Sequence, residues 1–369
     1  MKRKPHICFV LPKAYPLFNK NCNEIFGGAE VQMYLLAREF AKNKSLDVNV
    51  IVADYGQEPS EKYDGITIIK SFKFSDSSLI KNVKFLISFM RANADIYIQR
   101  TLDPASGIIA ILCKLLRKQF VYMVAHDGEV DGGYERNNGI VNALLANVAF
   151  KCADAAIVQN TNQKDILYTR KGRDSFLIKS GYSITDPSGA SKGDHVLWVG
   201  RSEQWKRPEL FIKLAERNRD LRFKMICPRA YKDYKDNYSL LKQRTECVEN
   251  LEFIEYVPFN EIDQYFQKAK VFVNTSTQEG FPNTFIQAAK NGTPIISLDV
   301  NPDNILDKYN CGFFCDGDLD EMDKRLGQLL NDNNLYERMS DNAYRYAKEN
   351  HDIEKNAEEL YRVLMGLKC

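Results

Sequence analysis

The chain has 369 residues, of which 44% are hydrophobic and 27% are charged. This length exceeds what one hydrophobic core usually organises, and the composition excludes a disordered or fibrous protein. The formal net charge of +2 provides no global basic field, so nucleic acid is not expected as a partner. We therefore expect a globular protein of two domains.

Apolar segments and cysteines indicate the compartment. The run from Ile7 to Leu11 is too short for the core of a signal peptide, and no segment approaches the ~20 apolar residues of a spanning helix. The nine cysteines are odd in number and mostly lie in apolar runs, which favours reduced thiols. Cys311 and Cys315 lack further ligands at metal-site spacing, so no metal is expected there. A cytoplasmic protein is predicted.

In the first half of the chain, short apolar runs alternate with helical patterns, as in a parallel sheet covered by helices. Strands are predicted at His6–Pro12, Val48–Ala53, Ile66–Ile69, Ile96–Ile98, Phe120–Val124 and Ala155–Val158. A helix with one buried face is predicted at Ala29–Lys42. Residues 182–194 are polar and rich in turn formers, which indicates a linker.

The same alternation restarts after the linker. Strands are predicted at His195–Val199, Arg222–Ile226, Glu252–Ile254, Val271–Val273 and Pro294–Ser297. Helices are predicted at Pro208–Asn218, Glu337–Asn350 and Ile353–Leu367. Because sheets of this kind bind ligands at the carboxyl ends of their strands, a cleft between two such units is the expected site.

Two short stretches at predicted strand ends are suited to phosphate. Gly27 and Gly28 precede a helix, where glycines let the backbone approach a ligand and the first amides favour an anion. Arg201 and Lys206 follow the first strand of the second half and could neutralise a diphosphate. Taken alone, each is better explained by a simple turn or by a solvated surface pair.

The stretch from Glu279 to Gln287 is the most specific in the chain. Glu279 lies in a predicted loop, while Asn283 and Thr284 begin a helix whose first amides suit a phosphate. Gln287 follows Asn283 by about one helical turn and is expected on the same side of the helix.

Taken together and in this order, the stretches resemble glycosyltransferase family 4, whose members have the GT-B fold. The matching segments are Gly27-Gly28-Ala29-Glu30, His126-Asp127, Gly200-Arg201 with Lys206, and Glu279 to Gln287 with Gly292-Thr293-Pro294. They span about residues 6–300. The resemblance implies an α/β protein with two Rossmann-like domains facing across a cleft. Residues 1–185 would bind the acceptor, residues 192–350 would bind the nucleotide sugar, and residues 353–369 would pack back on the first domain.

The resemblance also implies roles for single residues. The donor diphosphate would be held by Gly27, Gly28, Arg201, Lys206, Asn283 and Thr284. Glu279 would contact the transferred sugar, and His126 would lie beside the reacting carbon. Gln287 stands where the family usually carries a glutamate that binds the ribose diol, and an amide cannot accept from both hydroxyls as a carboxylate does.

No cofactor is implied. The acidic triplet Asp316-Gly317-Asp318 imitates a metal-binding motif, but it precedes a helix that begins near Leu319, so we expect it to cap that helix. The resemblance implies transfer with retention of the anomeric configuration, in which a departing phosphate oxygen takes the acceptor's proton on the same face of the sugar. The expected partners are a nucleotide-sugar donor and a glycan or lipid-linked acceptor, in polysaccharide or lipopolysaccharide synthesis.

Two alternatives stay open. A nucleotide-sugar epimerase shares this architecture but needs an acid and a base around one sugar carbon, and no second histidine lies in a comparable loop. A catalytically silent sugar-nucleotide-binding protein is motivated by Gln287.

A basic stretch with interleaved apolar residues lies in the predicted first domain. Its cations are Lys81, Lys84, Arg91, Lys114, Arg117 and Lys118. Such a face could contact anionic lipid, which leaves a peripheral position at the inner face of the membrane open. An ordinary solvated helix is the interpretation that we favour.

Overall fold

The computed structural model describes residues 4–22, 24–187, 192–230 and 236–367. The chain forms two compact units, one of Met1–Gly181 with Ile353–Cys369 and one of Tyr182–Asp352. Residues 188–191 of the predicted linker lie outside the described residues. The predicted fold class is confirmed, because each unit has a largely parallel sheet covered by helices.

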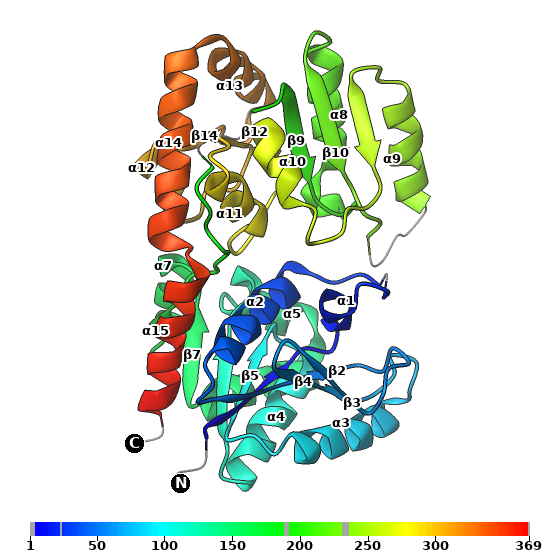
Figure 1. The fold of residues 1–369 in the computed structure, drawn as a ribbon, viewed down its shortest axis with the longest axis vertical. Helices are drawn as coiled ribbons and strands as arrows, with labels where there is room; N and C mark the ends of the chain where they lie inside the picture. Colours follow the sequence, from blue (N-terminus) through cyan, green and yellow to red (C-terminus); the bar gives the residue numbers. More distant parts are fainter. Residues whose placement is uncertain (1–3, 23, 188–191, 231–235, 368–369) are drawn as a thin grey trace. The chain divides into compact units, whose positions relative to one another are not determined.

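Among its described residues, the first unit contains an eight-stranded sheet of order β3-β4-β2-β1-β5-β6-β7-β8 (Figure 1). The strands are β1 (His6–Val10), β2 (Asp47–Val52), β3 (Ser60–Tyr63), β4 (Ile66–Lys70), β5 (Ile96–Arg100), β6 (Gln119–Met123), β7 (Ala155–Val158) and β8 (Phe176–Leu177). Only β3 pairs antiparallel, with β4, among the paired strands of this sheet. The central strands β1, β5 and β7 are almost wholly buried, and their sequences are mostly apolar.

Helices cover both sides of this sheet. They are α1 (Tyr15–Phe18), α2 (Gly28–Lys42), α3 (Ser78–Ala92), α4 (Pro104–Leu115), α5 (Gly133–Asn137), α6 (Gly139–Cys152), α7 (Thr161–Lys171) and α15 (Ile353–Gly366). The inner sides of α3, α4 and α6 share one apolar core with the sheet, through residues such as Phe89, Ile109 and Phe150. Figure 1 shows α2 on the other side of the sheet from α3 and α4. The helix α15 packs against α2.

The second unit contains a parallel sheet of order β11-β10-β9-β12-β13-β14. Its strands are β9 (His195–Val199), β10 (Arg222–Ile226), β11 (Leu251–Ile254), β12 (Ala269–Asn274), β13 (Ile295–Ser297) and β14 (Gly312–Phe314). The helices are α8 (Pro208–Arg217), α9 (Asn237–Glu246), α10 (Asp263–Lys268), α11 (Asn283–Lys290), α12 (Ile305–Lys308), α13 (Leu319–Asn331) and α14 (Asn333–Asn350). Trp198, Phe211 and Phe223 form the centre of an apolar core under this sheet.

The strand order positions a site in each unit. In the second unit the chain runs from β9 through β10 to β11 and then returns to β12 on the other side of β9. The loops after β9 and β12 therefore diverge, and the crevice between such loops is where open α/β sheets bind ligands. The corresponding reversal in the first unit lies between β1 and β5.

Candidate functional site

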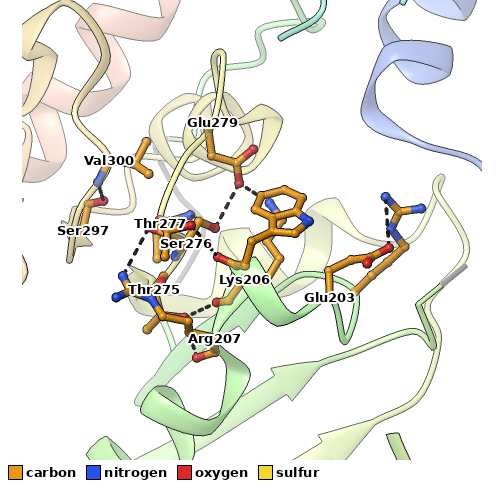
Figure 2. Close-up of polar contacts among 12 residues, drawn as sticks. Glu203, Lys206, Arg207, Thr275, Ser276, Thr277, Glu279, Ser297 and Val300 are labelled. Atoms are coloured by element: carbon orange, nitrogen blue, oxygen red, sulfur yellow. Dashed lines mark hydrogen bonds and ion pairs between the residues drawn. The ribbon is translucent and has the colours of Figure 1, made fainter. Parts of the chain in front are cut away.

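The best-defined polar cluster lies at the carboxyl edge of the second sheet. Arg201 and Lys206 lie in the loop after β9, and Glu279 lies in the loop after β12. Because β9 and β12 pair directly, these two loops are neighbours across the reversal point (Figure 2). The structure thus places the loops that carry three of the predicted residues side by side within one unit, and Lys206 and Glu279 are in direct contact.

Lys206 and Glu279 form an ion pair at the centre of this cluster. Their side chains are only 17% and 10% exposed, so a solvated surface pair is the wrong interpretation for Lys206. The Glu279 carboxylate also accepts a hydrogen bond from the Ser276 hydroxyl, at 3.0 Å. The Lys206 ammonium lies 4.3 Å from the centre of the Trp205 ring, where a cation is attracted to the π electrons.

The hydroxyl of Thr275 fixes the backbone that carries Lys206. It accepts a hydrogen bond from the Trp198 indole nitrogen at 2.9 Å and lies 2.6 Å from the carbonyl oxygen of Lys206. The amide of Thr277 donates to the carbonyl of Trp205 at 2.9 Å. These bonds join the loop after β9 to the loop after β12, so the cations and Glu279 keep a defined relation.

Arg207 was not predicted as a site residue, although it joins a third loop to the cluster. Its Nε donates to the carbonyl of Thr275 at 2.7 Å, and its guanidinium pairs with Asp299 in the loop after β13. The backbone of Arg207 is left-handed, with φ of 49°, a conformation uncommon for residues other than glycine. The position of Arg207 between Lys206 and the proline that begins α8 is only a weak indication of a binding site, and nothing in the sequence connects Arg207 with Asp299.

Arg201 adds a further cation to the same loop. Its guanidinium lies 3.9 Å from a carboxylate oxygen of Glu203, and its side chain is partly buried. The cluster therefore contains cations from the loop after β9, with carboxylates from that same loop and from the loops after β12 and β13. A ligand with several negative charges could accept hydrogen bonds from the N–H groups of these cations, as the carboxylates do in its absence.

The first turn of α11 follows Glu279 directly. Asn283 and Thr284 occupy this turn, and Pro282 at the N-cap makes no side-chain hydrogen bond to the helix. Gln287 lies one turn further on and is buried. Phe281, between Glu279 and the helix, packs against the buried ring of His351, with 4.8 Å between ring centres.

Gly27, Gly28 and His126 lie in the first unit, at the carboxyl edge of its own sheet. The amide of Gly27 donates to the Glu30 carboxylate at 3.0 Å, and a Cβ on Gly27 would lie 2.8 Å from that oxygen. The Glu30 side chain thus caps α2 through the amide of Gly27, and it would have to move slightly for a larger residue at this position.

His126 is exposed at the end of β6, and the residues after it hold its loop in place. The Asp127 carboxylate accepts from Gln163 at 2.8 Å, and burial raises its pKa. The buried carboxylate of Glu129 accepts from the Tyr122 hydroxyl at 2.7 Å and from the amide of Ala125 at 2.9 Å. Sequence reasoning missed Glu129 and Gln163.

The predicted capping role of the acidic triplet is confirmed for Asp318. Its side chain accepts from the amides of Asp320 and Glu321, at 2.8 and 3.1 Å, at the start of α13. Within the described ranges, no group of three or more His, Cys, Asp and Glu side chains is placed to hold a metal ion. Across the same described ranges, no helix combines the length and apolar character needed to cross a bilayer.

Two α/β units with these sheets define the GT-B fold. The structure matches the solved structure of HepE from Anabaena in complex with UDP and glucose, with a TM-score of 0.77 and 17% identity, over 98% of this chain and 100% of that one. It also matches WaaG, a glycosyltransferase involved in lipopolysaccharide biosynthesis, with a TM-score of 0.68 and 15% identity, over 98% of this chain and 100% of that one.

Sequence comparison points the same way. Residues 186–346 match the model of the family described as glycosyl transferases group 1. An uncharacterized glycosyltransferase of Haemophilus influenzae is 27% identical over 242 residues, which are 62% of this chain and 65% of that protein. The chain thus spans less than two thirds of that relative's length. The matched family region lies within the unit that contains Arg201, Lys206 and Glu279.

Proposed function

We propose that this protein is a retaining glycosyltransferase of family 4 that transfers a sugar from a nucleoside-diphosphate sugar to a glycan or lipid-linked acceptor. The observation that carries the proposal is the buried Lys206–Glu279 pair at the β9–β12 reversal point. It joins a cation suited to phosphate and a carboxylate suited to sugar hydroxyls where such sheets bind nucleotides.

In this proposal the donor diphosphate lies between the loop after β9 and the first turn of α11. Arg201 and Lys206 supply positive charge, and Asn283 and Thr284 supply the helix end that favours an anion. An ammonium has three N–H donors, so Lys206 can bind a phosphate oxygen and keep its bond to Glu279. Gly27 and Gly28 are assigned to the distal phosphate, as the family resemblance implies.

Glu279 and Gln287 contact different sugars of the donor. Glu279 accepts hydrogen bonds from hydroxyls of the transferred sugar, because an ionised carboxylate is an acceptor only. Gln287 contacts the ribose and accepts one hydrogen bond there. The likeness to HepE, solved with UDP and glucose, makes a uridine nucleotide the first donor to test.

Transfer takes place on one face of the donor sugar. The bond between the anomeric carbon and the diphosphate oxygen breaks, the acceptor oxygen bonds to the same face of that carbon, and the acceptor's proton passes to the departing oxygen. Arg201 and Lys206 stabilise the charge that grows on the diphosphate. His126 is assigned a place beside the reacting carbon, and no metal is needed for this chemistry.

The proposed location is the cytoplasm, in polysaccharide or lipopolysaccharide synthesis, with peripheral contact at the inner face of the membrane. Cysteine usage supports a reducing compartment. The eight cysteines of the described ranges are free, and burial raises the pKa of Cys113, Cys311 and Cys315 to about 12. The similarity to WaaG, which is involved in lipopolysaccharide biosynthesis, makes this pathway the first to consider.

The test is a panel of nucleotide sugars, screened by thermal shift and then by turnover with the purified chain. A matching donor at about 100 times its dissociation constant would stabilise the fold by roughly 2.7 kcal/mol. We expect one donor to bind and to be hydrolysed slowly or transferred, with retention at the anomeric carbon. Binding without turnover would indicate a silent binding protein, and a donor returned with one inverted sugar carbon would indicate an epimerase. Absence of any binding would refute the proposal.

A further inference from the structure

The helix α3 is apolar on two opposite sides. One side buries Phe85 and Phe89 in the core of the first unit. The other side exposes a second apolar stripe at helical spacing, with each side chain between 41% and 75% exposed. The residues of this stripe are Leu79, Ile80, Val83, Leu86, Ile87 and Met90. A helix of a soluble surface normally carries polar residues on its outer side, so this stripe requires an explanation.

The outer sides of α4 and α6 continue the same surface. Both helices bury their inner sides in the core that α3 also joins, so the three outer sides face away from the same side of the sheet. The two helices also pack closely, since a Cβ on Gly107 of α4 would lie 2.5 Å from the carbonyl oxygen of Leu145 in α6. Their exposed apolar side chains are Ile111, Leu115, Ile140, Val141 and Leu144. We call the outer sides of α3, α4 and α6 the apolar face.

The charged residues of the three helices all have the same sign. The helices α3, α4 and α6, of 15, 12 and 14 residues, contain no Asp or Glu, although 49 of the 369 residues of the chain are acidic. They contain Lys81, Lys84, Arg91, Lys114 and Lys151. Two of these lysines pair with carboxylates that lie outside the helices, at 2.8 Å in each case.

The combination of exposed apolar residues and cations favours one kind of partner surface for the apolar face over another. A second copy of the chain, related by a twofold axis, would place like-charged helices against each other, which costs binding energy. An anionic bilayer accepts apolar side chains among its acyl chains and cations among its headgroups. We propose that the apolar face binds the surface of an anionic membrane. The biological role of this binding rests on the proposed function, because membrane binding would hold the enzyme beside a lipid-linked acceptor.

Vesicle flotation tests this proposal without any sugar nucleotide. The probes are phosphatidylcholine vesicles with and without phosphatidylglycerol. We expect the wild-type chain to float with the anionic vesicles and to be released by high salt. The triple variant Leu79→Gln, Ile87→Gln, Met90→Gln should bind at least about tenfold more weakly, because three apolar side chains no longer enter the bilayer. The matched control is Leu240→Gln, which changes a leucine that is 62% exposed on α9, and it should bind like the wild type.

A charge variant and two further measurements separate the explanations. Arg91→Gln with Lys151→Gln, two exposed cations of α3 and α6, should weaken binding to anionic vesicles by roughly fivefold per cation at low salt, and should leave the melting temperature unchanged. Sedimentation velocity without vesicles should show the same mass for the wild type and the triple variant. A smaller mass for the triple variant would make the apolar face a protein interface and overturn the proposal, as would flotation that none of these substitutions reduces. Donor binding is measured separately by thermal shift, so its failure would count against the proposed function alone.

Discussion

Replacing Lys206 by glutamine should reduce both stability and activity. The substitution leaves the Glu279 carboxylate, which is 10% exposed, without its cation. Breaking a fully buried pair costs about 3–5 kcal/mol, and the residual exposure of this pair lowers our expectation to about 1–2 kcal/mol. For a unit of this size the melting temperature should fall by roughly 2–8 °C. Loss of the cation beside the diphosphate should reduce kcat/KM by about 100-fold or more.

Two further variants separate the structural effect from the functional one. The double variant Lys206→Gln, Glu279→Gln contains no unpaired charge, so its melting temperature should return close to that of the wild type while its activity stays low. The matched control is Lys171→Gln, because Lys171 pairs with Glu135 at similar exposure, 13% and 20%, and lies 5.0 Å from the Phe150 ring. This control should lose similar stability and keep full activity.

The assays are thermal denaturation and steady-state transfer with the donor found in the screen. If Lys206→Gln kept its kcat/KM within about threefold of the wild type, the diphosphate role would be wrong. Recovery of activity in the double variant would lead to the same conclusion, because the pair would then serve only to position its loops. A large loss of activity in Lys171→Gln would show that stability alone explains the data.

Arg201→Ala should lower turnover roughly 100-fold or more. The control Arg219→Ala changes an exposed arginine and should leave turnover unchanged. Equal rates for the two variants would show that Arg201 does not bind the diphosphate. Activity should survive EDTA, and a complete loss that magnesium or manganese restores would contradict the metal-free mechanism. Gln287→Glu should change activity by less than about tenfold, because the gain from stronger charge-assisted bonds and the cost of burying the charge oppose each other. Glu279→Gln should reduce activity far more. Kinetics that show the reverse order would disprove the separate ribose and sugar roles. Burial lowers the pKa of His195 to about 4, so below pH 6.5 the unfolded chain binds a proton that the folded chain does not, and stability should fall between about pH 6.5 and 4. The variant His195→Asn should lose less melting temperature than the wild type over that interval, and parallel pH curves would show that another group is responsible.

Strands that are buried on both sides could be predicted well from the sequence, and polar or very short ones could not. The predictions at His195–Val199 and Arg222–Ile226 coincide with β9 and β10, because the residues that these two strands bury are mostly apolar. The strand β3 is Ser-Glu-Lys-Tyr at the sheet edge, where no alternation or apolar run indicates pairing. The two residues of β8 are too few to give a pattern.

The candidate site was predictable only where its residues belong to stretches that resemble those of a known family. Lys206 and Glu279 are 73 residues apart, and their order relative to a known family suggested a common site before their contact was seen. Arg207 and Asp299 belong to no motif that the sequence analysis recognised, and their pairing depends on the adjacency of the loops after β9 and β13. For the segment from Leu79 to Arg91 the sequence favours an ordinary solvated helix, because residue spacing alone does not distinguish a second exposed apolar stripe from a broader buried one.

The first unit is discontinuous in the chain, which determines the order in which the protein can fold during synthesis. Residues 182–352 form the second unit as one continuous stretch, whereas the first unit also needs Ile353–Gly366. Until α15 leaves the ribosome, the side of α2 near Phe40 lacks Tyr361, whose ring centre lies 6.4 Å away in the folded protein. The first unit is thus completed after the second, and until then part of its apolar surface stays uncovered.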